Sequence, residues 1–340
     1  MHIHRKSLLY VLLLCAGAIH AQNYKKYLPE IHGTVRARYE YQTTEDNHRF
    51  QVRNARVDVS GKVIDMLGYR AEVDLCDQGK IKLVNAYVRL TPTKDWKITL
   101  GQMRAPFGID AHRSPHKRLF ANRSFVFKHL GNVRDVGLSV GYQLREGFPF
   151  SIDMGVFSGV GINKQTEWRK SKNLIVTGKL QLTPIENYNL TLSMMKTSPG
   201  SVNIFTYGAG TFYEWNKWHF EVEGIYKTYE DDAYDDVWGV NAMVYYDLYL
   251  KKEKAFIKKI SFLGRYDWMT DFALGVPDEE GKLKTSDSEK SRVTGGLTFS
   301  LGLPFQADLR LNYEKYFYRE NAIITPTEQD RIVAEVMVRF

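Results

Sequence analysis

The sequence predicts an all-β fold, a transmembrane antiparallel β-barrel of about sixteen strands. The first observation is residues 331–340, where apolar and polar side chains alternate and the stretch ends on Phe340. The second is the recurrence of similar period-two segments along the chain, because successive side chains of a strand face opposite sides of a sheet. The third is a regular alternation of short and long connections between these segments.

The N-terminal residues carry the pattern of a processing signal. Arg5 and Lys6 precede an apolar run, residues 8–19, that is too short to span a bilayer. Ala21 then offers a small residue for cleavage. We therefore expect a signal peptide over residues 1–21.

The remainder of the chain, residues 22–340, is expected to form one barrel domain, because no linker-like stretch or shift in composition divides it. A lipoprotein signal at Cys15 is the alternative for the N-terminus, but Leu14 stands where a small residue is wanted. Cleavage after residue 21 would leave Cys76 as the single cysteine. A lone cysteine cannot form an internal disulfide, which suits a barrel held by backbone hydrogen bonds.

Alternation also sets the facing of each strand. In the first strand, Val35 and Ala37 take one face, and Arg36 and Arg38 take the other. The pattern slips near residues 53–54 in the second strand, which predicts a β-bulge there. The expected strands are 31–42, 50–60, 69–76, 83–90, 96–102, 136–142, 150–157, 173–182, 188–195, 203–213, 218–227, 237–246, 260–268, 292–301, 307–316 and 331–340.

Connection lengths give independent support for a membrane barrel, in which periplasmic turns are short and external loops are long. The short, turn-rich connections follow even strands and are 91–95, 145–149, 183–187, 214–217 and 302–306. The longer ones follow odd strands and are 109–134, 158–172, 228–236, 269–291 and 317–329. Connections 247–259 and 77–80 fit this order less well. The alternative, a soluble β-sandwich, would show no such order.

A long stretch without periodicity, residues 104–134, is unusually basic. Its only acid is Asp110, and apolar side chains such as Phe120, Phe125 and Phe127 are interleaved with the bases. A loop in water has little use for these side chains, so we expect it to fold into the barrel and narrow the lumen. Its charges would then concentrate anions between low-dielectric walls. The candidate constriction residues are Arg104, Arg113, Lys117, Arg118, Arg123, Lys128 and Arg134.

The alternative for this stretch is a loop that stays outside the barrel and contacts lipopolysaccharide phosphates. Its histidines, His112, His116 and His129, are interpreted as neutral bystanders, because no metal-ligand spacing is present. We therefore expect no metal site.

A second set of candidates lies on the polar face of the first strands. These inner-wall residues are Arg36, Arg38, Arg56, Arg70 and Arg89. Arginine suits oxyanions because its planar guanidinium donates two parallel hydrogen bonds and remains charged. The same face carries Glu40, Asp58, Glu72 and Asp74. An anion ladder and a wall of compensating ion pairs are therefore both open interpretations.

Four motifs resemble the phosphate-selective porin O and P family: GQMRAPFG (101–108), RDVG (134–137), VNAYVRL (84–90) and RVDVSG (56–61). The resemblance implies a sixteen-stranded, trimeric outer-membrane porin that passes anions. Within the family, phosphate selectivity rests on an arginine ladder and a central lysine cluster, and neither is matched residue by residue in this sequence. Gln22 after the expected cleavage site and the 21 Tyr resemble Bacteroides-type variants.

These observations predict a passive diffusion channel in the outer membrane of a Gram-negative bacterium. We expect a preference for small anions, with phosphate, polyphosphate and organic acids all compatible with the pattern. Outer-membrane lipid, lipopolysaccharide and two further copies of the chain are the expected partners. No HExxH or CxxC motif occurs, so we expect no enzyme activity, cofactor or nucleic-acid partner. The alternative is a structural or adhesion barrel without an open pore.

Overall fold

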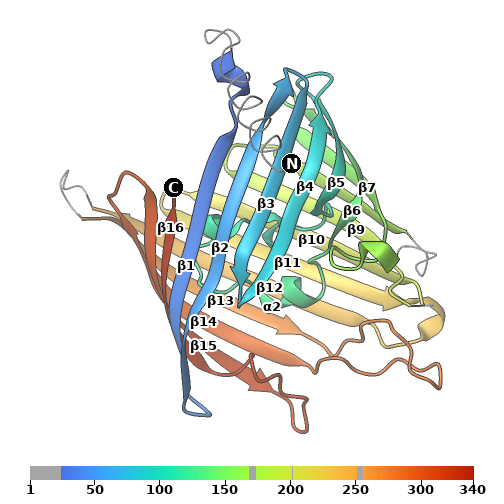
Figure 1. The fold of residues 1–340 in the computed structure, drawn as a ribbon. Coiled ribbons are helices and arrows are strands. Elements are labelled where there is room, and N and C mark those ends of the chain that lie inside the picture. Colours follow the sequence, from blue (N-terminus) through green and yellow to red (C-terminus); the bar gives the residue numbers. More distant parts are fainter. Residues whose placement is uncertain (1–23, 168–173, 201, 251–255) are drawn as a thin grey trace, which may run out of the picture.

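A computed structural model describes residues 24–167, 174–200, 202–250 and 256–340. Within them, sixteen antiparallel strands form one closed barrel in which β1 pairs with β16 (Figure 1). The predicted fold class is therefore confirmed. The strands are β1 Glu30–Gln42, β2 Asn47–Ile64, β3 Leu67–Asp77, β4 Lys80–Leu90, β5 Trp96–Arg104, β6 Arg134–Leu144, β7 Phe150–Phe157, β8 Ile175–Leu182, β9 Tyr188–Thr197, β10 Ile204–Trp215, β11 Trp218–Tyr229, β12 Val237–Tyr249, β13 Ile257–Met269, β14 Lys290–Leu301, β15 Gln306–Tyr318 and β16 Arg331–Arg339. The predicted signal peptide lies outside the described residues.

Facing along the strands follows the alternation of the sequence. On β16, Ile332 and Val336 are 44% and 50% exposed on the outside of the barrel, whereas Glu335 is fully buried inside it. On β1, Val35 is exposed while Arg36 and Arg38 are buried. The apolar residues therefore face lipid and the polar residues face the interior, because one side of each strand contacts the bilayer and the other side faces the polar lumen.

The predicted bulge in β2 is also confirmed. Arg36 on β1 pairs with Asn54, and the next residue, Ala37, pairs with Val52, so Arg53 is the extra residue. Several strands run further at their ends than alternation predicts; β2, for example, begins at Asn47 instead of residue 50. The first three residues of β2, Asn47, His48 and Arg49, are exposed and polar, and they extend the strand pairing beyond the alternating part of the sequence.

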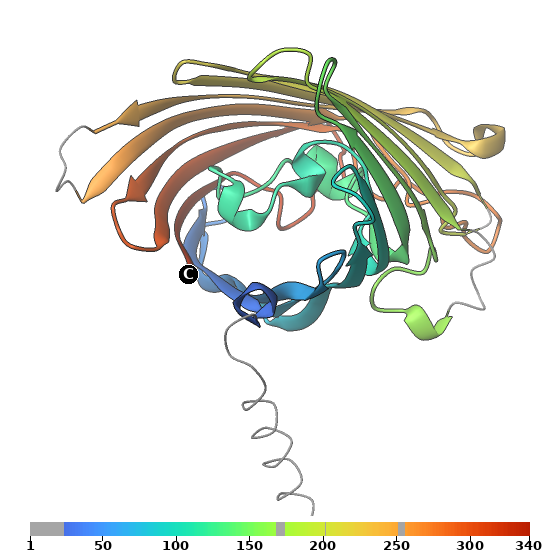
Figure 2. The same cartoon turned by 90° about the horizontal axis from the view of Figure 1, so that it is seen from above.

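Among the described residues, helical segments are few and short. They are η1 Tyr24–Tyr27, η2 Asp110–His112, η3 Pro115–Lys117, α2 Phe125–His129, η4 Gln165–Glu167 and η5 Glu230–Asp232. None of the helices in the described residues is long and apolar enough to span a membrane. Figure 2 shows that the connection between β5 and β6, which contains η2, η3 and α2, lies inside the ring of strands. We call residues 105–133 the constriction segment.

Candidate functional site

A tight turn after β5 sends the chain into the lumen. Gly108 has φ +65°, and a Cβ there would lie 2.5 Å from Glu223 Oε1 and 2.9 Å from Phe127 Cε1. The next two amides, of Ile109 and Asp110, donate to the two carboxylate oxygens of Glu223 at 2.5 Å and 3.1 Å. Only glycine fits both the left-handed backbone and the close approach. The turn therefore fixes the constriction segment to β11, on the far wall.

Apolar side chains hold the segment against that wall. Phe107, Phe125, Val126 and Phe127 are each at most 1% exposed and form the centre of the hydrophobic core. Val126 packs over Gly239 of β12, where a Cβ would approach Val126 Cγ1 to 2.7 Å. The buried core of this protein thus lies inside the barrel, between the segment and the wall. The predicted inward fold of this stretch is confirmed, and the external alternative is wrong.

Side chains of the wall satisfy the backbone of the segment. The amide of Ala121 donates to Asn312 Oδ1 of β15 at 2.7 Å. The hydroxyl of Thr298 on β14 donates to the carbonyl of Leu119 at 2.7 Å. Irregular backbone buried inside a barrel needs such partners, because its own carbonyls and amides form few mutual hydrogen bonds.

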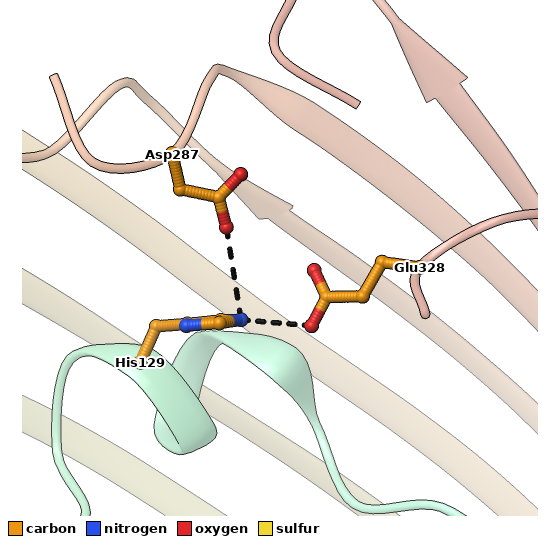
Figure 3. A group of neighbouring side chains, drawn as sticks. All are labelled: His129, Asp287 and Glu328. Carbon is orange, nitrogen blue, oxygen red and sulfur yellow. Dashed lines mark hydrogen bonds and ion pairs between the residues drawn. The ribbon is translucent and has the colours of Figure 1, made fainter. Parts of the chain in front are cut away.

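The outer end of the segment is fixed by a charged cluster. His129 of α2 lies 2.8 Å from Glu328 Oε1 and 3.7 Å from Asp287 Oδ2, and both acids come from external connections (Figure 3). Lys128 Nζ lies 2.6 Å from Glu328, and Lys290 Nζ lies 2.5 Å from Asp287 and from Glu328. These contacts tie α2 to the connections before β14 and β16.

The same cluster offers three metal-ligand types within 4.8 Å of one another, from His129, Asp287 and Glu328. However, the ammonium groups of Lys128 and Lys290 already neutralise the two carboxylates. A divalent ion would have to displace a fully buried lysine, which is costly. We therefore interpret the cluster as an anchor. The three residues of the cluster come from connections far apart in sequence. The spacing of the histidines alone could therefore not reveal the cluster.

A cavity of about 340 Å³ lies between the other face of the segment and the wall formed by β2 to β8. Seven basic side chains line it against the two carboxylates of Glu72 and Asp153. The basic residues are Arg56, Arg70, Arg89, Lys97, Arg104, Arg134 and Lys179. We call this the permeation cavity. Its lining has a strong excess of basic side chains over carboxylates.

Two of the inner-wall arginines in the permeation cavity are ion-paired. Arg56 Nε lies 2.9 Å from Asp74 Oδ2, and its Nη1 lies 3.0 Å from Glu72 Oε1. Arg70 Nε donates to Asp58 Oδ2 at 2.6 Å. For Arg56 and Arg70, the contacts are those of a wall of compensating ion pairs.

Three other arginines of the cavity have no carboxylate partner among the described residues. Arg89 Nε donates to Thr99 Oγ1 at 3.0 Å, and Arg134 Nη1 donates to Asn85 Oδ1 at 2.6 Å. Arg104 has a buried Nε without any hydrogen-bond partner in this part of the chain. Within the described part of the chain, no ion pair therefore neutralises the positive charge of these three.

Two lysines of the permeation cavity were not among the sequence candidates. Lys97 of β5 lies 2.8 Å from Asp153, while Lys179 of β8 is 7% exposed and forms no ion pair within the described ranges. Strand alternation already places Lys97 on the polar face. Alternation along β8 likewise indicates that Lys179 faces the interior. Alternation alone does not show that Lys179 lies at the same depth in the barrel as the constriction segment.

The remaining constriction candidates lie on the covered face of the segment. Arg113 forms a bidentate contact with Glu221, at 3.1 Å and 2.5 Å. Arg123 Nε lies 3.4 Å from Asp110, and Arg118 donates to the carbonyl of Arg113 at 2.7 Å. Burial raises the pKa of the Asp110 carboxyl, but the combined positive charges of Arg118 and Arg123 lower it by more. The pKa of Asp110 therefore lies well below its usual range.

The last candidates also lie outside the permeation cavity. Lys117 is exposed, and Lys128 belongs to the anchor of α2. Arg36 is buried, paired with Glu335 at 2.8 Å, and donates to the carbonyl of Ala121. Arg38 donates to Asn122 Oδ1 at 2.7 Å. The structure thus brings Arg104, Arg134, Arg56, Arg70 and Arg89 together and separates the others from them.

A GxSxG pattern occurs once in the sequence, at residues 137–141. It lies in the middle of β6, where Gly137 to Gly141 pair with β5 and β7. A nucleophile serine of this pattern needs a sharp strand-to-helix turn, so Ser139 is a wall residue of the cavity.

Comparison with known proteins gives a family and a set of folds. Residues 26–184 match the family model described as phosphate-selective porin O and P, and no curated protein matches the sequence. The anion-selective porin from Comamonas acidovorans superimposes with TM-score 0.62 at 12% identity, over 92% of this chain and 98% of that one. Salmonella typhi OmpF in complex with daunomycin gives 0.60 at 11% identity, over 93% and 98%. The trimer form of Vibrio cholerae OmpT gives 0.59 at 11%, over 92% and 99%.

Proposed function

We propose that this outer-membrane porin, whose residues 26–184 belong to the phosphate-selective porin O and P family, passes small anions by passive diffusion. It lies in the outer membrane of a Gram-negative bacterium. Family and fold indicate a channel and not an enzyme. The proposal concerns the preference for anions and the residues that produce it.

The observation that supports this preference is the charge of the permeation cavity. Seven basic side chains face two carboxylates across a passage of about 340 Å³. A narrow passage with low-dielectric walls focuses the field of such charges, which raises the local concentration of anions and excludes cations. Passive selectivity of this kind needs no cofactor or conformational cycle.

The unpaired arginines carry most of the effect in this proposal. Arg89, Arg104 and Arg134 hold hydrogen-bonding groups toward the cavity without a carboxylate that would cancel their charge. Arg56 and Arg70 are partly neutralised by Asp58, Glu72 and Asp74, a set that keeps them in place. An anion therefore meets a row of guanidinium groups of which three are uncompensated.

We further propose phosphate among the solutes. Guanidinium groups bind oxyanions bidentately, and five arginines line the cavity. Polyphosphate and small organic acids fit the same chemistry. Phosphate should then compete with chloride for the passage and reduce the chloride current at equal ionic strength.

Three further proposals concern processing and assembly. Residues 1–21 are proposed as a signal peptide, which N-terminal sequencing of the protein from the outer membrane tests directly, with Gln22 as the expected first residue. A homotrimer is proposed because one similar barrel is described in a trimer form. Light scattering of the purified protein in detergent measures the mass of the assembly and tests for three copies of the chain. Lipopolysaccharide is proposed as a partner of the exposed external connections.

The deciding experiment is the reversal potential of single channels in a planar bilayer under a KCl gradient. Wild type should favour chloride. Combined replacement Arg89→Gln, Arg104→Gln and Arg134→Gln should lower the ratio of anion to cation permeability at low salt. A unit charge about 5 Å from an ion in water contributes about 0.8 kcal/mol, or about fourfold. Screening at 1 M KCl should reduce the difference.

Two controls accompany this measurement. The triple replacement by lysine keeps the charge and should keep the anion preference. Arg145→Gln removes an exposed arginine whose side chain donates to the carbonyl of Lys94 in a periplasmic connection, and it should leave the reversal potential unchanged. A wild-type preference for cations would contradict the proposal. Absence of steady conductance would favour a structural or adhesion barrel.

A further inference from the structure

A second, smaller cavity lies on the covered face of the constriction segment. Its volume is about 40 Å³, and it shares no lining residue with the permeation cavity. Asp110, Arg118 and Phe120 line it from the segment, and Asn241 and Arg265 line it from β12 and β13. A solute in this place would sit between the segment and the wall, away from the passage.

Polar atoms of the lining lack partners among the described residues. The buried Arg118 Nε, Arg265 Nη2 and Asn241 Oδ1 each form no hydrogen bond there. Arg265 is 6% exposed and Asn241 is 1% exposed. Leaving buried polar groups unpaired costs about 1–3 kcal/mol each, so three around one small cavity indicate a bound species that pairs with them.

The remaining contacts of the two arginines do not satisfy them. Arg265 Nε lies 3.0 Å from Asp267 Oδ2, and its Nη1 donates to the carbonyl of Asn122 at 2.9 Å. Arg118 donates from Nη2 to the carbonyl of Arg113. Each guanidinium therefore keeps an unused donor, and both residues line the small cavity.

Charge gives the second argument. Arg113 is paired with Glu221, Arg265 with Asp267, and Arg123 with Asp110. Arg118 forms no ion pair within the described ranges, although its side chain lines the cavity. Arginine does not lose its proton in proteins. The lining of the cavity thus holds four basic side chains, of Arg113, Lys117, Arg118 and Arg265, against the single carboxylate of Asp110.

We propose that this cavity is a binding site for one small monovalent anion, such as chloride, held by Arg118 and Arg265. A cavity needs about 10–15 Å³ to hold one water, so about 40 Å³ admits a monoatomic anion. Phosphate, with five heavy atoms, needs more room. Water would satisfy the donors but would not offset the excess of basic side chains around the cavity.

The amide of Asn241 is compatible with an anion. Oxygen and nitrogen of an asparagine amide are assigned from the hydrogen-bond network, and with the amide turned, Nδ2 becomes a third donor into the cavity. The bound anion would then join the segment, through Arg118, to β12 and β13, through Asn241 and Arg265. Its role is structural: it fixes the position of the segment that narrows the passage.

Diffraction from crystals of the wild-type protein grown in sodium bromide tests the site directly, because bromide scatters anomalously and is close to chloride in size. An anomalous peak within hydrogen-bonding distance of Arg118 and Arg265 is expected. Density without an anomalous signal in this cavity would identify water and overturn the proposal. Peaks confined to the permeation cavity would overturn it as well.

Thermal unfolding of the purified barrel, read as loss of the compact form on unheated gels, gives an independent test in solution. Sodium chloride should raise the unfolding temperature above its value in sodium gluconate at equal ionic strength, because gluconate is too large for the site. Arg118→Gln should abolish most of this difference. Arg104→Gln, in the permeation cavity, and the exposed Arg145→Gln should retain it.

An equal chloride effect in Arg118→Gln and wild type would overturn the proposal, since the variant lacks the unpaired charge. If Arg118→Gln does not fold, Arg265→Lys provides the second variant, because it keeps one charge and removes the fork of donors. It should weaken the chloride effect while leaving the reversal potential of the channel on the anion side. The reversal-potential measurement and the chloride-dependent unfolding therefore test the two proposals independently of each other.

Discussion

Glu328 is a residue whose charge state is set by its neighbours at the outer end of α2. Burial raises the pKa of its carboxyl, but the hydrogen bond with His129 and the charge of Lys128 lower it more strongly. The pKa therefore lies well below its usual range. A carboxyl with a depressed pKa stabilises the folded state above its unfolded pKa, about 4.3. That contribution is lost as pH falls through the folded pKa.

Glu328→Gln should therefore lower the unfolding temperature at neutral pH, because Lys128 and Lys290 lose the charge that pairs with them. The difference from wild type should persist from about pH 7 to about pH 5 and shrink below about pH 4. Unfolding of the barrel in detergent at several pH values measures it. Glu320→Gln, an exposed acid of the same connection, should change little, and an equal loss in both variants would contradict the anchor.

At the scale of an element, the constriction segment depends on the turn at Gly108. Gly108→Ala would place a Cβ 2.5 Å from Glu223 Oε1, in addition to straining a backbone with φ +65°. We expect a misplaced segment, with a larger and less uniform single-channel conductance. Gly147→Ala is the matched control, because Gly147 has φ +76° and nothing within 4 Å of its Cβ position. Similar conductance in the two variants would show that the close approach is unimportant.

The strand β16 depends on its lipid-facing side. Val336 is 50% exposed on the outside of the barrel, so Val336→Arg places a charge against lipid. Such a charge costs about 2–4 kcal/mol near the midplane of the bilayer. We expect a strongly reduced yield of heat-modifiable barrel in the outer membrane. Val336→Leu keeps the face apolar and should insert normally, whereas normal insertion of the arginine variant would place this side of β16 away from lipid.

At the scale of the whole molecule, the lumen is divided unequally. The constriction segment covers the wall from β9 to β16 together with β1, and the permeation cavity faces β2 to β8. In a Cys76→Ser background, Arg89→Cys should react quickly with a water-soluble thiol reagent. Arg36→Cys, equally inward but covered by Ala121, should react slowly. Val88→Cys, on the lipid side, should not react.

Fold and strand phase were predictable because alternation is local. Arg36, Arg56 and Arg89 each have apolar neighbours in sequence that fix their side of the sheet, and the bulge at Arg53 was visible as a slip in that pattern. Strand ends were less well predicted. Residues such as Asn47 continue the backbone pairing, but both faces of the strand are exposed there. The side chains therefore do not alternate between apolar and polar, and the sequence pattern gives no sign of the strand.

The site could be predicted only in part, since the path of the constriction segment depends on distant residues. Arg36 and Arg56 have the same phase and similar sequence surroundings. The segment covers Arg36 because Asn312 holds Ala121, whereas Arg56 faces the permeation cavity. Likewise, Arg113 is neutralised by Glu221, more than a hundred positions away. Charge counting within residues 104–134 could not distinguish these cases from Arg104 and Arg134.

Closure of the barrel has a consequence for how the protein folds. The amide of Gly33 donates to the carbonyl of Phe340 at 2.7 Å, and the amide of Phe340 donates back at 3.1 Å. These partners come from opposite ends of the barrel sequence, so their pairing carries the largest loop-closure entropy of any strand pair. High contact order of this kind slows folding. Until β1 meets β16, both strands present unpaired edges, which invite association with other chains. We therefore expect refolding to be slow and its yield to fall as protein concentration rises.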